Sequence, residues 1–450
     1  MTDHLPYDLV IRAARAVTGA GETTCAVAVS GGRIAAVTGV DDPLPAHQTI
    51  RLAPDTVLLP GLIDTHVHLQ DPGGTGWEDF AHGTTAAAAG GFTTVVDMPL
   101  DSSPVTTSVA ALTAKRAAAR GRCHIDVGFW GGVVPGNLAD LAPLRAAGAL
   151  GFKCFLGETG NPDFPALTVD ELTAAMRETA RIGVPLLVHA EFTPEHSAAT
   201  VRTYSDYLAR HPADLEDAAV LAVLDAARRT GARVHITHLS SANTVPALAA
   251  ARADGVRVTV ETCPHYLTFS ADDVPDGATQ FKVCPPIRAA EHRERLWAAM
   301  IAGVIDQIAS DHSPGPAPTG PDFAAAFGGI AGLQLTLPAV WTAARSRGAT
   351  PADLARWLAS APAAFAGLDA PTGSGGGGRK GRIAVGYDAD LCAFAPDERF
   401  VVDPAHLRSL RRSTPYTGRV LYGVVRGTWL RGRPMPDGVP HGRVLTHPTT

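Results

Sequence analysis

The chain has 450 residues, of which 46% are hydrophobic and 18% charged, and its formal net charge is −6. This length predicts a large domain with a smaller one, since single cores rarely grow far beyond about 250–300 residues. The small negative charge argues against a nucleic-acid-binding protein, and the apolar stretches are too short to cross a membrane. Without a signal-peptide pattern or a CxxC pair, the chain is expected to be cytoplasmic with reduced thiols.

Short strand-like runs lie at both ends of the chain. They cover residues 8–12, 25–29 and 33–37 at the amino end and 381–386, 389–394 and 420–425 at the carboxyl end. Gly- and Asp-rich turns separate them. We therefore expect residues 1–56 and 371–450 to form one small β domain together. Within the second segment, residues 373–378 have the composition of a flexible linker and lack the GK[ST] of a phosphate loop.

The middle of the chain, residues 57–370, alternates strand-like and helical segments. The predicted strands are 57–65, 92–97, 124–130, 149–155, 184–189, 233–238, 256–262 and 304–310. The predicted helices are 79–90, 108–120, 170–182, 215–230, 243–254 and 291–303. Eight strands alternating with helices favour a closed (β/α)8 barrel. The alternative, a doubly wound open sheet, normally carries a Gly-rich phosphate fingerprint after its first strand, and this chain has none.

Side chains able to bind a metal fall at the carboxyl ends of the predicted barrel strands. His66 and His68 end the first strand, and extended backbone projects residues two apart to the same side. Four further strands end in Lys153, His189, His238 and Asp311. In a (β/α)8 barrel these strand ends surround one mouth, which is where such proteins place their chemistry. The pattern predicts a metal site there.

Each of these residues also has a structural interpretation. His189 or His238 alone is more often a buried histidine with satisfied hydrogen bonds, and Asp311 alone fits a helix N-cap. His235 shares no face with His238, and we interpret it as structural. Lys153 is harder to explain, because burying an ammonium in an apolar strand is costly unless it is paired or neutralised.

Lys153 is unusual among metal ligands because an ammonium has no lone pair to offer. Either the amine is deprotonated, or it reacts with carbon dioxide to form a carbamate. The two anionic oxygens of a carbamate can bridge two divalent metals that lie about 3.5–4 Å apart. The other candidate ligands then divide into His66, His68 and Asp311 on one metal and His189 and His238 on the other.

The ordered motifs resemble those of the cyclic amidohydrolases, a family that includes dihydroorotase, hydantoinase and allantoinase. They are Asp64-Thr65-His66-Val67-His68, Gly151-Phe152-Lys153, Val188-His189-Ala190-Glu191, Thr237-His238-Leu239-Ser240-Ser241 and Ser310-Asp311-His312-Ser313-Pro314. The resemblance covers essentially the whole chain. It implies a (β/α)8 barrel, a β-sandwich built from both chain ends, and two metals bridged by carboxylated Lys153. Zinc is the expected metal, with iron, cobalt or manganese as alternatives, and the protein is expected to be a homodimer or homotetramer.

Further segments are similar to the allantoinases within that family. They are residues 97–100, 151–155, 261–266, 282–288, 328–334 and 413–419. Dihydroorotases usually carry an arginine where this chain has Gln70, which disfavours orotate chemistry. The resemblance implies hydrolytic opening of a cyclic ureide, with allantoin to allantoate as the first choice. It further implies Asp311 as the catalytic proton acceptor and Cys284, Ser313 and Gln334 as substrate contacts.

Loops near the expected mouth depart from the allantoinase pattern. Gly74 and Gly76 stand where the family usually has Arg and Glu, and Asp101 stands where it has Asn. Arg210-His211-Pro212 replaces a usual Ser-Arg-Pro. These departures, with Gln70, leave the metal ligands intact and bear on the choice of substrate.

Two alternative functions follow from the same motifs. The first is a hydantoinase-like or dihydropyrimidinase-like activity on another cyclic amide. The second is a non-catalytic scaffold on the same fold, although such relatives typically lose metal ligands and all six positions are filled here. Around the site, Glu191 and Glu261 are expected to orient ligand histidines or to form structural salt bridges. We do not expect His265 or His312 to bind metal.

Overall fold

The computed structural model of the chain describes residues 6–73, 76–194, 200–316, 320–370, 379–435 and 438–446. The expected linker at 373–378 and the departure at Gly74 lie outside these residues.

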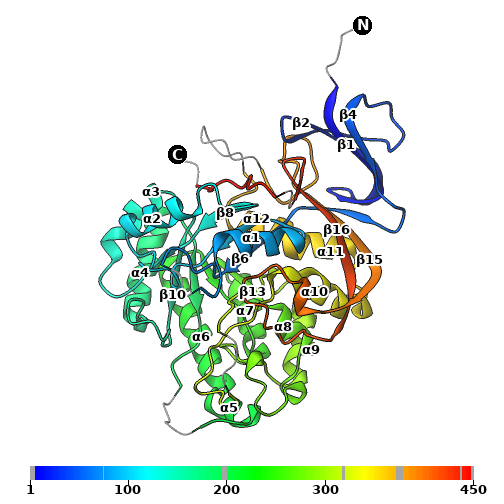
Figure 1. Cartoon of the computed structure of the whole chain (residues 1–450). Helices are drawn as coiled ribbons and strands as arrows, with labels where there is room; N and C mark the ends of the chain where they lie inside the picture. The colour runs from blue at the N-terminus through cyan, green and yellow to red at the C-terminus, as the bar shows by residue number, and fades with distance from the viewer. Residues whose placement is uncertain are drawn as a thin grey trace.

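Strands from the two ends of the chain form one mixed sheet. Its order is β17-β16-β15-β5-β1-β2-β3, and β4 pairs with β1. The strands are β1 (Tyr7–Thr18), β2 (Gly21–Ser30), β3 (Arg33–Thr38), β4 (Ala46–Arg51), β5 (Val57–Pro60), β15 (Leu391–Val401), β16 (Val420–Leu430) and β17 (Arg433–Met435). Alternate residues bury on opposite faces, with Leu9 and Ile11 in one apolar cluster and Val10 in another. Figure 1 shows the blue and orange strands lying side by side.

The apolar run 57–65 is divided at Gly61, so the prediction of a single strand was wrong. β5 pairs with β1 and β15 in the sheet of the chain ends, whereas β6 (Leu62–Val67) pairs with β7. Gly61 allows the change of partner, because a Cβ there would lie 2.4 Å from Thr93 Oγ1. The sheet of the chain ends therefore extends to residue 60, beyond the boundary expected at 56. A continuous apolar run does not reveal that the strand changes sheets.

The strands of the middle segment form two parallel sheets. One has the order β6-β7-β8, and the other has the order β14-β13-β12-β11-β10-β9. These strands are β7 (Phe92–Asp97), β8 (Asp126–Phe129), β9 (Gly131–Gly132), β10 (Phe152–Phe155), β11 (Leu186–His189), β12 (Val234–Ile236), β13 (Val258–Thr262) and β14 (Gln307–Ile308). Hydrogen bonds link the sheets at both edges; for example, Leu150 N–H donates to Phe129 O (3.0 Å), and His68 N–H donates to His312 O (2.8 Å).

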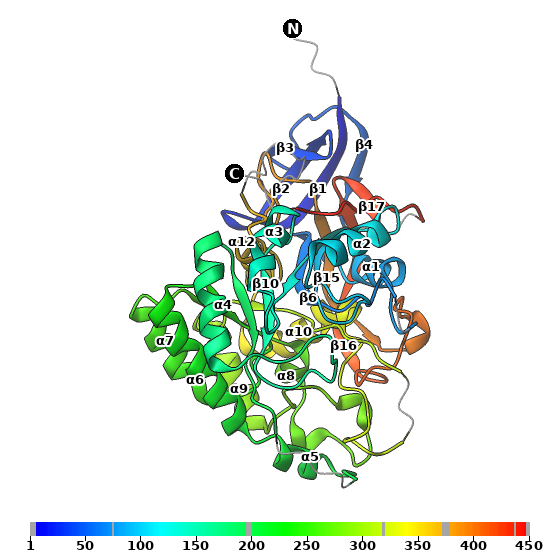
Figure 2. The same ribbon diagram turned by 90° about the vertical axis from the view of Figure 1, so that its left-hand side faces the viewer.

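Helices cover the outer side of these sheets (Figure 2). The α-helices of the described residues are α1 (Phe80–Ala89), α2 (Val109–Ala119), α3 (Leu141–Ala146), α4 (Val169–Ile182), α5 (Tyr204–Arg210), α6 (Ala213–Thr230), α7 (Val245–Ala253), α8 (Pro264–Thr268), α9 (Ala290–Ile301), α10 (Thr336–Ala344), α11 (Pro351–Ala355) and α12 (Ala361–Phe365). All six predicted helices are confirmed, as α1, α2, α4, α6, α7 and α9. Side-chain caps help to define their starts; Asp79 caps α1, Ser108 caps α2, and Thr168 with Glu171 forms a capping box on α4.

A buried ion cluster ties the sheet of the chain ends to the β6-β7-β8 sheet. Lys380 Nζ lies 2.7 Å from Asp126 Oδ2 on β8, 2.6 Å from Asp390 Oδ2 and 3.3 Å from Asp388 Oδ2. Arg431 Nη1 lies 2.6 Å from Asp126 Oδ2. Burial alone would lower the pKa of Lys380, but the three carboxylates raise it above its ordinary value.

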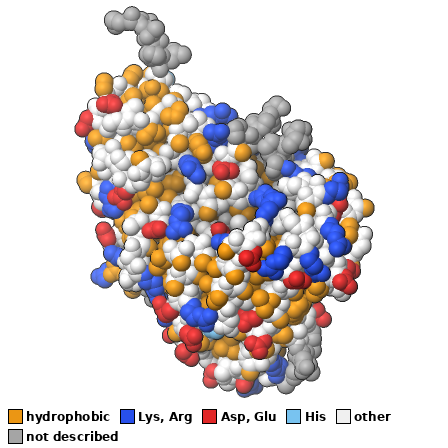
Figure 3. Space-filling view, turned by 180° about the vertical axis from the view of Figure 1, so that it is seen from behind, with side chains coloured by type: hydrophobic (Ala, Val, Ile, Leu, Met, Phe, Trp, Pro, Cys, Tyr) orange, Lys and Arg blue, Asp and Glu red, His pale blue; other side chains and the backbone are white. Residues whose placement is uncertain are grey.

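On the face seen in Figure 3, acidic and basic side chains are interspersed and do not form a block of one sign. Within the described ranges, no helix combines the length and the apolar character needed to span a bilayer.

Candidate metal centre

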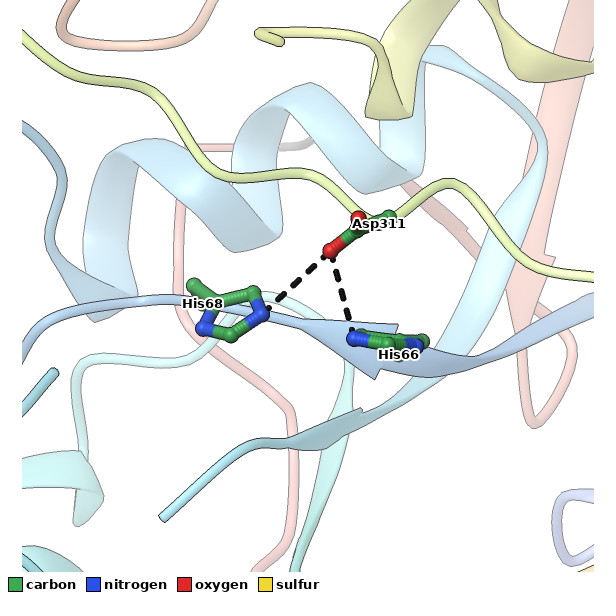
Figure 4. A group of neighbouring side chains, drawn as sticks. All are labelled: His66, His68 and Asp311. Atoms are coloured by element: carbon green, nitrogen blue, oxygen red, sulfur yellow. Dashed lines mark ion pairs between the residues drawn. The ribbon is translucent and has the colours of Figure 1, made fainter. Parts of the chain in front are cut away.

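Three of the predicted ligands converge at the end of β6 (Figure 4). Asp311 Oδ1 lies 3.2 Å from His66 Nε2 and 3.4 Å from His68 Nε2. Ligand atoms of the three residues lie within 4.8 Å of one another. Burial alone would raise the pKa of Asp311, but the nearby His66 and His68 hold it well below its usual range. The arrangement presents two ring nitrogens and one carboxylate to the same point.

The other nitrogens of these two imidazoles face carboxylates. His66 Nδ1 lies 2.5 Å from Glu261 Oε1, and His68 Nδ1 is hydrogen-bonded to Asp101 Oδ2. A carboxylate can only accept, so it favours a proton on Nδ1 and leaves Nε2 with a lone pair for a metal. Glu261 thus has the expected orienting geometry. The sequence predicts for Asp101 only an effect on the choice of substrate. Its position just beyond the strand that ends at Asp97 is the signal that could have predicted its role in orienting His68.

We expect Asp101→Ala to weaken metal binding by about 10–100-fold, the range typical when a partner of a ligand histidine is removed. Competition with a chromophoric chelator measures the effect. Asp101→Asn should lose less, because its amide oxygen still accepts from His68. Asp140→Ala, which removes an exposed carboxylate, is the control. Wild-type metal affinity in Asp101→Ala would exclude an orienting role for Asp101.

His189 and His238 form a second group of facing nitrogens. His189 Nδ1 lies 2.9 Å from His238 Nε2, and His189 Nε2 lies 3.7 Å from Glu191 Oε2. His238 has φ of +37° and Asp311 has φ of +48°, a backbone region that side chains other than glycine rarely adopt. Such strain persists where the surrounding structure enforces it, which is common at functional sites.

Lys153 projects from β10 into the same buried region. Its side chain is fully buried, and burial lowers the pKa of its amine to about 8. Its Nζ donates to Thr237 Oγ1 at 2.8 Å, which is its one hydrogen bond within the described ranges. An ammonium has three protons to donate, so this environment is poorly suited to an ordinary buried lysine.

Other histidines near the site have different surroundings. His312 Nε2 lies 3.2 Å from Glu78 Oε2, and its Nδ1 accepts from Leu333 N–H. His235 Nε2 lies 3.0 Å from Glu261 Oε2 in the interior. His265 approaches Asp311 and Cys263 closely enough for their ligand atoms to lie within 4.8 Å of one another. Burial raises the pKa of the Cys263 thiol well above its ordinary value, which disfavours the thiolate that a metal requires.

A cavity of about 380 Å³ opens onto these groups, and both Cys284 and Ser313 line it. Gln334 does not. Its Nε2 donates to His406 O (3.2 Å) and its Oε1 accepts from Arg408 N–H (2.8 Å), in a separate groove. The side chain of Gln334 therefore faces away from this cavity, and its role as a substrate contact stays a prediction. Gln70 is also absent from the lining, and its Nε2 donates to Pro314 O at 2.8 Å. Sequence motifs identify a loop but not which of its residues face the cavity.

Comparisons with known proteins agree with this geometry. The Amidohydrolase family model matches residues 57–435. The chain is 50% identical to the allantoinase of Streptomyces avermitilis, over 98% of each chain. It is 40% identical to that of Arabidopsis thaliana, over 95% of this chain and 88% of the relative. Its fold matches the solved L-hydantoinase (dihydropyrimidinase) of Arthrobacter aurescens, with TM-score 0.91 and 29% identity, covering 98% of this chain and 100% of that one.

The chain therefore belongs to the amidohydrolase family, and it is a hydrolase of cyclic amides. Its curated relatives named above are allantoinases, and the structural neighbour is a hydantoinase. Membership implies a binuclear metal centre, for which the structure contains candidate ligand groups.

Proposed function

We propose that the chain opens a cyclic ureide by metal-dependent hydrolysis, converting allantoin to allantoate. The observation that carries this proposal is the convergence of His66, His68 and Asp311, beside His189 and His238, on one cavity. The cavity volume of about 380 Å³ falls in the range of small-molecule sites. The 50% identity to an allantoinase over 98% of the chain supports the choice of substrate.

We infer that the two parallel sheets form a closed (β/α)8 barrel, with a β-sandwich beside it. The hydrogen bonds from Leu150 to Phe129 and from His68 to His312 support closure, because they join the sheets at two edges. On this proposal the barrel domain begins after Gly61 and ends near residue 370. The remaining segments from both chain ends make the sandwich.

The donor set fits two divalent metals, with zinc as the first choice. His66, His68 and Asp311 would hold one, His189 and His238 the other, and carboxylated Lys153 would bridge them. The chemistry that such a pair supplies is a water of lowered pKa and a polarised amide carbonyl. Carboxylation would also explain why Lys153 is buried with one hydrogen bond, to Thr237, in the part of the chain that the structure describes.

The residues of the chain then have separate roles in ring opening. Asp311 receives the proton of the attacking water and returns it to the leaving ring nitrogen. Glu261 and Asp101 fix the orientations of His66 and His68. Cys284 and Ser313 on the cavity wall lie where backbone and side-chain groups can position the ring. The cytoplasmic location and the homodimer or homotetramer remain predictions.

The alternatives are tested by assaying allantoin, hydantoin and dihydrouracil side by side, before and after metal removal with a chelator. We expect allantoin to be preferred, and its hydrolysis to stop on chelation and return with added zinc. Preference for hydantoin or dihydrouracil would favour the hydantoinase-like function. Absence of turnover on all three by metal-loaded protein would favour the scaffold.

A further inference from the structure

His211 and Glu191 form a polar pair on the cavity wall, beside the metal centre. Glu191 Oε1 lies 3.8 Å from His211 Nδ1, and both residues line the cavity. The other carboxylate oxygen of Glu191 lies 3.7 Å from His189 Nε2. The pair therefore connects a candidate metal ligand to the wall on which a substrate would lie.

The position of His211 is fixed by its neighbours. It ends α5, and its backbone N–H donates to the carbonyls of Tyr207 and Leu208. Its ring packs against that of Tyr207 with centroids 4.6 Å apart. Its carbonyl accepts from Arg288 Nη1 at 3.0 Å, and Arg288 is in turn held by buried Glu216. A side chain held this way is preorganised to meet a ligand at little further cost in entropy.

Pairing with Glu191 leaves one ring nitrogen of His211 as a hydrogen-bond acceptor. Within the described residues, neither His211 Nδ1 nor Glu191 Oε1 has a hydrogen-bond partner, and the two atoms face each other at 3.8 Å. At that distance the carboxylate favours a proton on Nδ1 by charge, because a carboxylate can accept but not donate. Nε2 then keeps its lone pair, and across the described residues no partner bonds to it. The cavity wall thus offers a fixed acceptor for an N–H group.

We propose that His211 Nε2 accepts a hydrogen bond from the ureido arm that allantoin carries outside its ring. This arm is rich in N–H donors, whereas unsubstituted hydantoin has the same ring without the arm. His211 is then a specificity-determining residue, and Glu191 is a positioning residue that acts through it. The inference rests on the proposed function and names the part of the substrate that the wall recognises.

The test compares His211→Ala and His211→Gln with wild type. Three quantities are measured: KM and kcat for allantoin, and Ki for hydantoin as a competitive inhibitor. We expect His211→Ala to raise KM for allantoin about tenfold, the effect of losing one good hydrogen bond, while Ki for hydantoin shifts less than threefold (roughly 0.6 kcal/mol). His211→Gln should recover part of the loss, because its Oε1 can replace Nε2 as acceptor. His47→Ala, on the exposed strand β4, is the matched control.

Two results would overturn the inference. An unchanged KM for allantoin in His211→Ala would show that Nε2 makes no contact with the substrate. An equal rise in KM and Ki would show that His211 shapes the cavity without recognising the arm. Both differ from failure of the proposed function, in which wild-type protein with its metals would not hydrolyse allantoin at all.

Discussion

Replacing Lys153 with Met is expected to lower kcat/KM for allantoin by about a thousandfold. Met has nearly the length of Lys and suits the buried, apolar surroundings of this side chain, so the fold should survive. It cannot form a carbamate, and the two metals would lose the ligand between them. Several kcal/mol of transition-state stabilisation depend on that arrangement, and about 4 kcal/mol corresponds to the stated loss. Steady-state kinetics and metal analysis of the purified variant measure both effects.

Lys153→Arg distinguishes the carbamate from a role for positive charge. Arg keeps the positive charge, but its guanidinium forms no carbamate near neutral pH. The Lys153→Arg variant should therefore be as inactive as the Lys153→Met variant. Acetate or propionate added to Lys153→Ala should restore part of the activity, because a small carboxylate fits the space left by the side chain. A Met or Arg variant that kept both metals and full activity would contradict the bridging model.

Replacing Lys380 with Met is expected to lower the free energy of unfolding by about 3–5 kcal/mol, the usual cost of removing one partner from a buried ion pair. Three carboxylates, those of Asp126, Asp388 and Asp390, surround its ammonium, and all are buried. Among the described residues, Arg431 would then be the cation that remains beside them, and of the three carboxylates it forms an ion pair with Asp126. The loss should appear as an earlier first transition in urea denaturation followed by circular dichroism.

Asp388→Asn is the matched control for this cluster. Asp388 is the farthest of the three carboxylates from Lys380, at 3.3 Å, and removing it reduces an excess of negative charge. We therefore expect a smaller loss of stability than in Lys380→Met, because Lys380 keeps Asp126 and Asp390 as partners. If Lys380→Met unfolded at the same urea concentration as Asp388→Asn, the cluster would not be what joins the two sheets.

Hydrophobic periodicity predicted the alternation of strands and helices well, because each repeating unit buries its own apolar face. The segment 57–65 shows what that signal omits. β5 and β6 are both fully buried, so both have the same apolar composition, yet they belong to different sheets. The change occurs at Gly61, and it depends on contacts with Thr93 and Asp390 that are distant in the sequence.

The candidate site was predictable where a side chain must lie at a strand end. His66, His68 and Asp311 meet because parallel strands bring their carboxyl ends to one edge. The position of a loop residue in the sequence does not constrain where its side chain points in this way. Asp101 faces His68, and Gln334 faces away from the cavity toward His406 and Arg408. The direction of a loop side chain depends on long-range packing that no local pattern encodes.

We propose that residues around this cavity hold metals and open a ureido-substituted ring by hydrolysis. The ratio of kcat/KM for allantoin to kcat/KM for hydantoin, measured on metal-loaded protein with the product identified, tests it most directly. We predict a ratio above about ten, equivalent to about 1.4 kcal/mol of preference, with allantoate as the product. A ratio below one would contradict the assignment and identify the chain as a hydantoinase-like enzyme.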